Sequence, residues 1–476
     1  MTQEPPPSAP GQAWPQHDAP QQVLGVREAV AIIVGIVIGA GIFKAPAMVA
    51  GMTGNAAWMF AAWLLGGIMS LVGALCYAEL ATAYSHTGGD YHFLRRAYGH
   101  SVSFLFGWAR FSVITTGSIA LLAFVFGDYM HQILPLHALG KTMSQSAYAA
   151  AAVALLSWIN LRGTRTGAST QAWLTAVEVS GLLLIVSAAV FVPGPAGPDG
   201  AAAADAAPSP SSLGLAMVFV LLTYGGWNEA AYISAELKDV RRNMVRSLIW
   251  SIAIITVLYL LVTWAYWNVL GMKGLARSEA VAADMLQVAF GDIGARLVSA
   301  IVAVSALTSI NATMIVGARA SYAIGRDWHI LSALGAWDKR RGTPANALRI
   351  QCAAALLLVA VGTWTGSGFK SMVEFTAPVF WLFFLLSGIS LFVLRKREPG
   401  TERPFRVPLY PLLPALFCAT CAYMLWSSLS YVYSQSLGGL NAAWIGVAVL
   451  AAGLVLLLLM RTRSGRRRQS AFRSIS

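Results

Sequence analysis

Charged residues are scarce in this sequence. Asp, Glu, Lys and Arg make up 11% of its 476 residues, compared with about 25% in a typical soluble domain. The residues AVILMFWYC make up 57%, which is more apolar surface than a soluble chain of this length can bury. A lipid bilayer accepts such a chain. The composition therefore excludes a soluble globular protein and indicates an integral membrane protein.

Several functional signals are also missing. The four cysteines lie in apolar segments, and neither they nor the seven histidines show the spacing of a metal site, so no metal or cofactor is expected. No G-x-x-x-x-G-K-[ST] motif is present, which argues against an ATP-driven pump. Residues 1–24 are rich in Pro, Gln and Ala and lack the apolar core of a signal peptide, which predicts a disordered tail.

Long apolar segments alternate with short basic segments along the chain. A transmembrane helix needs about 20 mostly apolar residues, so the pattern predicts an all-α membrane protein of about twelve helices. The eighth segment is long enough to begin with a short surface helix. The predicted helices cover residues 27–50, 56–82, 102–133, 145–161, 168–192, 212–236, 246–271, 283–325, 347–365, 369–394, 407–433 and 440–461.

The basic residues indicate an orientation. Most of the 33 Lys and Arg residues fall on alternate connections and on the C-terminal tail, and such connections face the cytoplasm. Both termini are therefore predicted to be cytoplasmic, and the Ala- and Arg-rich composition favours a bacterial inner membrane. The expected parts are a cytoplasmic tail (1–24), a transport core (25–395), helices 11 and 12 (396–461) and a basic cytoplasmic tail (462–476).

Two of the predicted helices carry glycines at mid-membrane depth. The first reads GIVIGAGIFKAP at 35–46, and the sixth reads TYGGWN at 223–228. Backbone groups freed at that depth are tolerated only where they line a cavity or bind a ligand. Two interrupted helices, five helices apart, are typical of transporters built from inverted repeats with a central site. Helices 1–5 and 6–10 would form the two repeats, followed by two further helices.

The chemistry of such interruptions suits an amino acid. Backbone amides at the start of a half-helix, after Gly39, favour a carboxylate, and unwound carbonyls favour an ammonium group. An α-amino acid carries both groups. The alternative is that the glycines only permit close helix packing, as in the small-xxx-small pattern of Gly35 and Gly39. The corresponding positions of the two interruptions favour a binding site.

Five motifs, in order, resemble those of the amino acid–polyamine–organocation superfamily, whose members share a five-plus-five inverted repeat. The resemblance covers the chain from Arg27 to about Tyr433, and the YGGWN core is most similar to the L-type amino acid transporter branch. The motifs are GAGIF at 39–43, YAEL at 77–80 with GGDYHFLRRAYG at 88–99, YGGWNEAAYISAELKDVRRN at 224–243, Asn311 with GARASYAIGRD at 317–327, and RPFRVPLYP at 403–411.

The resemblance assigns nine residues to the substrate site. It implies that backbone amides after the first interruption bind the substrate carboxylate and that carbonyls at both interruptions receive the ammonium. It also implies that three side chains shape the pocket and hold the unwound segment. The amides belong to Ala40, Gly41 and Ile42, the carbonyls to Val37, Leu222 and Gly225, and the side chains to Tyr224, Trp227 and Asn228.

The sequence departs from the superfamily pattern in three places. Ala40 replaces a common serine, and Leu222 replaces a frequent aromatic gate. Because Leu222 offers no cation–π contact to a cationic substrate, neutral amino acids are favoured. The outer loop 128–146 contains no cysteine, so the disulfide to an ancillary subunit found in some animal relatives is not expected.

Glu178, in the fifth helix, is the most conspicuous single residue. It occupies a position where many members of the superfamily carry a lysine in a sodium-like site. An ionisable group at this depth is costly and is a candidate for function by default. Glu178 could take up and release a proton during transport, it could help to bind a cation, or it could be a neutral or paired residue hydrogen-bonded to the first helix.

The other charged residues near the membrane are expected to have local partners. Glu79 and Glu236 are predicted to pair with nearby arginines, and Arg110 and Arg319 to hold contacts at the inner gate or to face the cytoplasm. Glu229 follows the second interruption directly and could belong to the pocket or to the gate.

The sequence therefore predicts a secondary active transporter of amino acids that works either by proton coupling or by exchange. The substrates would be neutral L-amino acids, moved by alternating access. A transporter of polyamines or other organic amines with the same fold is the alternative, and it would need an acidic pocket. A membrane enzyme is a remote alternative, because the sequence shows no cluster of His, Cys or acidic residues at membrane depth.

Overall fold

Helices make up nearly all the regular structure of the described chain. The protein is represented by a computed structural model, in which the described residues show only two isolated β-bridges besides helices. The predictions for the first 21 residues and for the tail 462–476 lie outside the described residues, as does the start of the predicted helix 440–461. The described residues are 22–43, 45–86, 88–192, 208–278, 281–365, 368–434 and 448–459.

The first half of the chain contains one interrupted helix and a set of long helices. A 3-10 turn, η1 (Ala40–Phe43), lies in the first interruption, and a π-helical segment, η2 (Arg110–Thr115), joins two helices of the predicted third span. The α-helices are α1 (Val26–Val37), α2 (Ala45–Thr53), α3 (Ala56–Ala83), α4 (Asp90–Tyr98), α5 (His100–Ala109), α6 (Thr116–Ile133), α7 (Gly140–Leu161) and α8 (Thr164–Phe191).

The second half begins with the other interrupted helix. A 3-10 helix of ten residues, η5 (Trp227–Glu236), continues the chain beyond α9. A final described helical stretch covers Ala448–Leu459. The α-helices are α9 (Pro210–Thr223), α10 (Val240–Arg277), α11 (Val281–Phe290), α12 (Asp292–Asp327), α13 (Ala345–Thr365), α14 (Gly368–Arg397) and α15 (Leu412–Ser434).

The apolar helices have the length that a bilayer requires. Within the described ranges, eight helices are long and apolar enough to cross a membrane. The two interrupted segments escape this length criterion because each is split into shorter pieces. The predicted segment 283–325 does begin with a separate short helix, α11, and Gly291 turns the chain into α12 with a φ of 60°.

The surface of the bundle is apolar and its interior holds polar groups. Large side chains such as Trp173 and Phe191 of α8 are mostly exposed, while Gln171 and Glu178 of the same helix are fully buried. This distribution is the reverse of that in a soluble protein and suits contact with lipid. Buried polar residues therefore mark the places where contacts between helices are not purely apolar.

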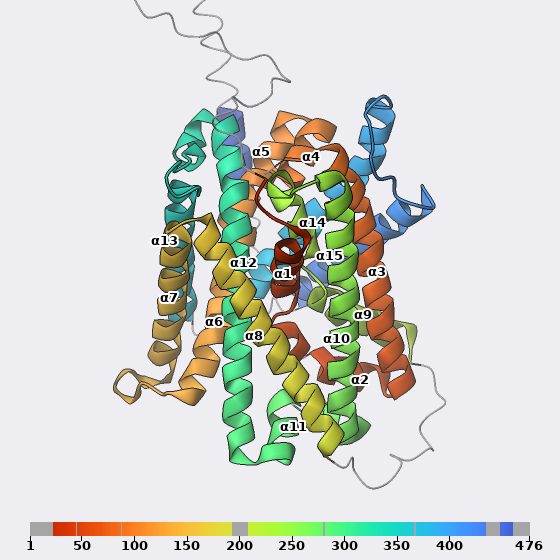
Figure 1. Ribbon diagram of the computed structural model, residues 1–476, viewed down its shortest axis with the longest axis vertical. Coiled ribbons are helices and arrows are strands. Elements are labelled where there is room, and N and C mark those ends of the chain that lie inside the picture. The colour runs from red at the N-terminus through yellow and green to blue at the C-terminus, as the bar shows by residue number, and fades with distance from the viewer. Residues whose placement is uncertain are drawn as a thin grey trace, which may run out of the picture.

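The interrupted helix α1 lies near the middle of the bundle, with α4 at one end of the long axis and α11 at the other (Figure 1). It packs against α8, α10 and α12. Close approach to α8 is possible because a Cβ atom at Gly35 would lie 2.3 Å from Nε2 of Gln171. The centre of the molecule is thus built around the first interruption.

Candidate functional site

The first interruption frees backbone carbonyls at the end of α1. The helix ends at Val37, and Ile38 adopts an extended conformation before η1 begins. A helix end leaves its last carbonyls without intrahelical partners. The Ser309 hydroxyl, from α12, lies 3.2 Å from the Gly35 carbonyl oxygen and 3.0 Å from that of Ile38. A side chain from a distant helix therefore caps the interrupted end.

The second interruption depends on glycine. After α9 ends at Thr223, Gly226 takes a left-handed φ of 113°. A Cβ atom at this position would lie 2.6 Å from Cγ2 of Ile36, so both the backbone conformation and the space require glycine. The contact also places the second interruption directly against the end of α1. The two glycine-rich segments, far apart in sequence, therefore meet.

Tyr259 of α10 joins the two interruptions through one hydroxyl group. Its oxygen lies 3.0 Å from the Val37 carbonyl oxygen and 3.0 Å from the Thr223 carbonyl oxygen. A hydroxyl has a single proton to donate, so the two carbonyls share it. The residue is fully buried. Sequence reasoning missed Tyr259, because a tyrosine in the apolar segment VLYLLV carries no motif.

Several of the predicted site residues lie where the two interruptions meet. A Cβ atom at Gly41 would lie 3.0 Å from the Thr223 side chain, so η1 touches the end of α9. The Leu222 carbonyl accepts a hydrogen bond of 3.1 Å from the Gly225 amide, and the Leu222 side chain is 45% exposed. Ile42 is buried. The expected amides and carbonyls thus come from adjacent pieces of backbone.

Tyr224 and Trp227 contact helices that flank the second interruption. The Tyr224 hydroxyl donates to the Trp63 carbonyl of α3 at 3.1 Å. Trp227 packs edge-on against Tyr77, with ring centroids 5.3 Å apart, and also against Phe384. Both side chains are buried and anchor the second interruption to neighbouring helices. They hold its backbone in place from the side.

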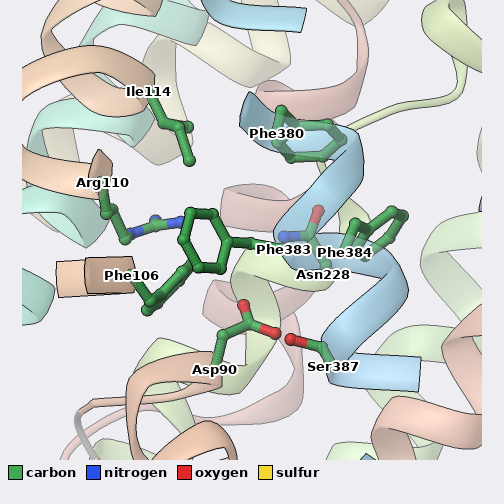
Figure 2. A pocket seen from close by; sticks show the side chains of 9 residues that line it. All are labelled: Asp90, Phe106, Arg110, Ile114, Asn228, Phe380, Phe383, Phe384 and Ser387. Atoms are coloured by element: carbon green, nitrogen blue, oxygen red, sulfur yellow. The ribbon is translucent and has the colours of Figure 1, made fainter. Parts of the chain in front are cut away.

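Asn228 lines a small internal cavity beside the second interruption. The cavity has a volume of about 10 Å³, roughly that of one water-sized probe. Figure 2 shows the Phe383 ring next to the end of the Arg110 side chain in this view, the Phe380 and Phe384 rings farther from Arg110, and Asp90 and Ser387 pointing toward one another. The lining residues are Asp90, Phe106, Arg110, Ile114, Asn228, Phe380, Phe383, Phe384 and Ser387.

An ion pair crosses from η2 to η5 at this cavity. The Arg110 guanidinium, buried at the start of the π-helical segment, pairs with the Glu229 carboxylate. Its Cζ atom also lies 3.9 Å from the centre of the Tyr232 ring. The Tyr232 hydroxyl donates to Asp90 at 2.9 Å. Arg110 and Glu229, both predicted to lie near the pocket or the gate, are therefore partners of one another.

Glu178 is completely enclosed between helices. Its side chain is 0% exposed, and neither carboxylate oxygen has a hydrogen-bond partner within the described residues. Ser305 of α12 and Tyr259 of α10 lie within electrostatic range of the carboxylate. Thr175, one turn earlier on α8, donates to the Ala31 carbonyl of α1 at 3.1 Å. Glu178 therefore lies on the helix that braces α1.

A chain of buried amides connects the same helices. Asn160 of α7 donates to Asn311 of α12 at 2.7 Å, and Asn311 donates to Gln171 of α8 at 2.9 Å. Gln171 in turn donates to Thr175 at 3.2 Å. The sequence motif that contains Asn311 gives no partner for its side chain. The structure makes it the centre of a polar network that ends at α1.

Ion pairs concentrate at the α4 end of the bundle. The prediction that Glu79 and Glu236 pair with arginines is confirmed. Arg395 binds Glu79 with two hydrogen bonds, the shorter 2.6 Å, and Arg319 binds Glu236 with both partners almost fully buried. Further pairs at this end are Arg95–Asp327, Arg96–Glu398 and Arg241–Glu402.

The N-terminal segment and a histidine pair complete this end. Leu24 forms a bridge with Leu237, through amide–carbonyl hydrogen bonds of 2.9 Å to Glu236 and Lys238. The rings of His86 and His92 stack with centroids 4.4 Å apart. Burial lowers the pKa of His86 to about 4 and lowers that of His92 well below its usual range. The pair is therefore neutral near pH 7.

The chain is similar in sequence to several known amino acid transporters. The b(0,+)-type amino acid transporter 1 of Homo sapiens is 30% identical over 86% of this chain and 83% of its own length. The Asc-type amino acid transporter 1 of Mus musculus is 28% identical over 92% of this chain and 80% of its own. The serine/threonine exchanger SteT of Bacillus subtilis is 29% identical over 85% of this chain and 91% of its own.

The family match covers nearly all of the described helices. A family model described as "Amino acid permease" matches residues 24–458. The match begins at the bridge formed by Leu24 and extends into the last described helical stretch. It includes both interruptions, Glu178 and the ion pairs at the α4 end. The chain belongs to the amino acid permease family.

Proposed function

We propose that the protein is a secondary active transporter of neutral L-amino acids that works by alternating access. The observation that carries this proposal is the meeting of the two interruptions, with the Val37 and Thr223 carbonyls both within 3.0 Å of the Tyr259 hydroxyl. Backbone groups at a helix interruption can bind both ends of a zwitterion. The relatives named as amino acid transporters support the same substrate class.

In the proposed binding mode, backbone groups bind both the carboxylate and the ammonium group of the substrate. The amides of Ala40, Gly41 and Ile42 bind the carboxylate at the start of a half-helix. Carbonyls of Val37, Leu222 and Gly225 receive the ammonium group, which offers three donors. Leu222 provides an apolar wall and no aromatic face. This absence of a cation–π partner supports neutral side chains rather than cationic ones.

We further propose the complete architecture that the sequence predicted. Twelve transmembrane helices would form two inverted repeats of five plus two C-terminal helices, in a bacterial inner membrane. The concentration of arginine at the α4 end supports a cytoplasmic position for that end and for both termini. The cysteine-free outer loop 128–146 supports transport without a disulfide-linked subunit.

Alternating access requires a barrier that opens and closes at each face. The buried Arg319–Glu236 pair and the Leu24–Leu237 bridge both hold the far end of η5. They would form the cytoplasmic barrier when the substrate faces outward. Opening that side would require both contacts to separate while α1 and η5 tilt about their interruptions.

Glu178 is the proposed site of proton coupling. A buried carboxyl group without a hydrogen-bond partner within the described residues is costly when charged and is best accommodated when it carries a proton. Its position beside the helix that supports α1 would couple protonation to movement of the first interruption. In the exchange mode, Glu178 would instead be structural. The two modes make different predictions for one substitution.

The test is transport into proteoliposomes. Radiolabelled L-alanine, L-leucine and L-arginine would be offered with and without an inward proton gradient, and with internal amino acid present or absent. Gradient-driven uptake that Glu178→Gln abolishes supports proton coupling. Uptake that requires internal amino acid and survives Glu178→Gln supports exchange.

The same experiment judges the alternative substrate class. Folded protein that moves none of these amino acids would contradict the proposal and favour polyamines or other organic amines. An organic amine would need a free acidic partner in the pocket. Glu229 is already occupied by Arg110, which leaves Glu178 as the remaining candidate acid among those that the sequence identified.

A further inference from the structure

Two carboxylates face a single cation at the cavity beside the second interruption. Arg110 is the only cation among the nine lining residues, and Asp90 is the only acid among them. Glu229 pairs with Arg110 from the next position after Asn228. Asp90 is held by the hydroxyl groups of Tyr77 and Tyr232, at 2.5 and 2.9 Å. Without Arg110, the charged groups among these residues would be the two carboxylates of Asp90 and Glu229.

The cavity also contains polar atoms that the protein does not use. Nε of Arg110 and Oδ1 of Asn228 are buried and have no hydrogen-bond partner within the described residues. Buried polar atoms are rarely left unpaired. Here a donor and an acceptor line one cavity, which is large enough for a group of about the size of a hydroxyl.

The Arg110 guanidinium is held in the way that a protein holds a bound organic cation. It is stacked on the Tyr232 ring and paired with Glu229 at the start of a π-helical segment. π-Helical insertions are frequent at functional sites. An aromatic face together with a carboxylate is a good binding place for any organic cation. Arg110 already fills that place from within the protein.

We infer that Arg110 is a tethered cation that determines substrate charge: it occupies the Glu229–Tyr232 place and thereby excludes amino acids with cationic side chains. A neutral side chain, in particular one with a hydroxyl group, meets Asn228 and the unpaired Nε atom. Lysine or arginine as substrate would bring a second cation against Arg110. This inference rests on the proposed transport of amino acids and names the residue that selects among them.

The test measures selectivity rather than total activity. Uptake of radiolabelled L-serine into proteoliposomes would be measured in the presence of L-lysine, L-glutamate or unlabelled L-alanine. The inhibition constants of the three competitors would then be compared. For Arg110→Gln, we expect inhibition by L-lysine to strengthen at least tenfold relative to L-alanine. Arg110→Lys keeps the cation and should retain the wild-type ratio. For Glu229→Gln, the change should favour the opposite charge: inhibition by L-glutamate should strengthen relative to inhibition by L-alanine.

A matched control comes from the second buried pair on η5. The double variant Arg319→Gln/Glu236→Gln also removes an arginine–glutamate pair, but away from the cavity lining. It should leave the ratio of lysine to alanine inhibition unchanged, whatever its total activity. A similar gain for lysine in this control would overturn the inference, because any loosening of η5 would then suffice.

Low stability of a variant does not prevent the test. Ligands that bind the folded protein raise its melting temperature, so L-lysine should stabilise detergent-solubilised Arg110→Gln more than it stabilises wild type. An unchanged lysine-to-alanine ratio in folded Arg110→Gln would overturn the inference while leaving amino acid transport intact. Absence of any amino acid uptake by wild type would instead contradict the proposed function.

Discussion

The two interruptions differ in what holds them. The end of α1 is held by neutral groups, since Ser309 and Tyr259 donate hydrogen bonds to its freed carbonyls. The second interruption continues into η5, which is held by charged groups at both of its ends, through Glu229 and Glu236. In the proposed mechanism, one interruption therefore binds the groups common to all amino acids, while the other carries the charges that select substrates and form barriers.

This difference has an energetic consequence. A neutral hydrogen bond contributes about 1 kcal/mol, whereas an uncompensated buried charge costs about 3–5 kcal/mol. Damage to the supports of η5 should therefore be more severe than damage to the supports of α1. Three experiments compare the two interruptions on that scale, and a fourth tests the histidine pair that contacts η5.

The largest effect is expected when a charge is stranded on η5. Arg319→Met removes the partner of the buried Glu236 and should lower the free energy of unfolding by about 3–5 kcal/mol. Thermal unfolding in detergent measures this loss. The double variant Arg319→Met/Glu236→Met should recover most of it, because no charge is left unpaired. A single variant as stable as wild type would show that Glu236 has another partner.

Glycine substitutions test the backbone at each interruption. Gly226→Ala forces a left-handed conformation on alanine and a clash with Ile36, so a loss of about 1–3 kcal/mol is expected. At Gly39 the nearest atom to an added Cβ is Oγ of Ser309, at 3.4 Å, and Gly39→Ala should cost less. The two melting temperatures decide the order. The reverse order would mean that the first interruption is the more rigid one.

Tyr259 tests the link between the interruptions. Tyr259→Phe keeps the ring but removes the hydroxyl shared by the Val37 and Thr223 carbonyls. We expect the activation free energy of transport to rise by about 1.4 kcal/mol, which slows uptake about tenfold. Size-exclusion chromatography should show that the variant does not aggregate. Ser309→Ala is the control, because it removes a hydroxyl that contacts only the first interruption, at the Gly35 and Ile38 carbonyls, and it should slow uptake less. Equal effects would show that the link to α9 is unimportant.

The smallest effect concerns pH. Ser234 of η5 contacts the backbone of His86, whose pKa burial lowers to about 4. Because the unfolded chain binds a proton near pH 6.5 and the folded chain does not, stability is lost as pH falls from about 7 toward 4. Asp327, Arg95 and Arg96 are the charged groups around the histidine pair.

We expect the melting temperature of wild type to fall by about 2–4 °C between pH 7.5 and 5.5 because of the histidine pair. The double variant His86→Gln/His92→Gln should fall less over the same range. The comparison isolates the pair, because acidic groups elsewhere affect both proteins alike. Identical pH profiles for the two proteins would contradict the assigned cause.

Much of the site could be predicted because glycine is informative at membrane depth. Gly39, Gly41, Gly225 and Gly226 identified both interruptions, and the arginines close to Glu79 and Glu236 predicted ion pairs there. By contrast, Tyr259 and Ser309 had no recognisable signal. Their importance comes from which carbonyl they meet, and that depends on how α10 and α12 pack against α1.

The sequence by itself determined the membrane environment, the helical class and the positions of the two interruptions. These properties follow from local composition, because hydropathy and glycine act over a few residues. Only the tertiary structure decided that Arg110 faces Glu229, that Asn311 joins three helices, and that one tyrosine spans both interruptions. Such contacts join residues more than a hundred positions apart or on different helices, and chain packing alone brings them together.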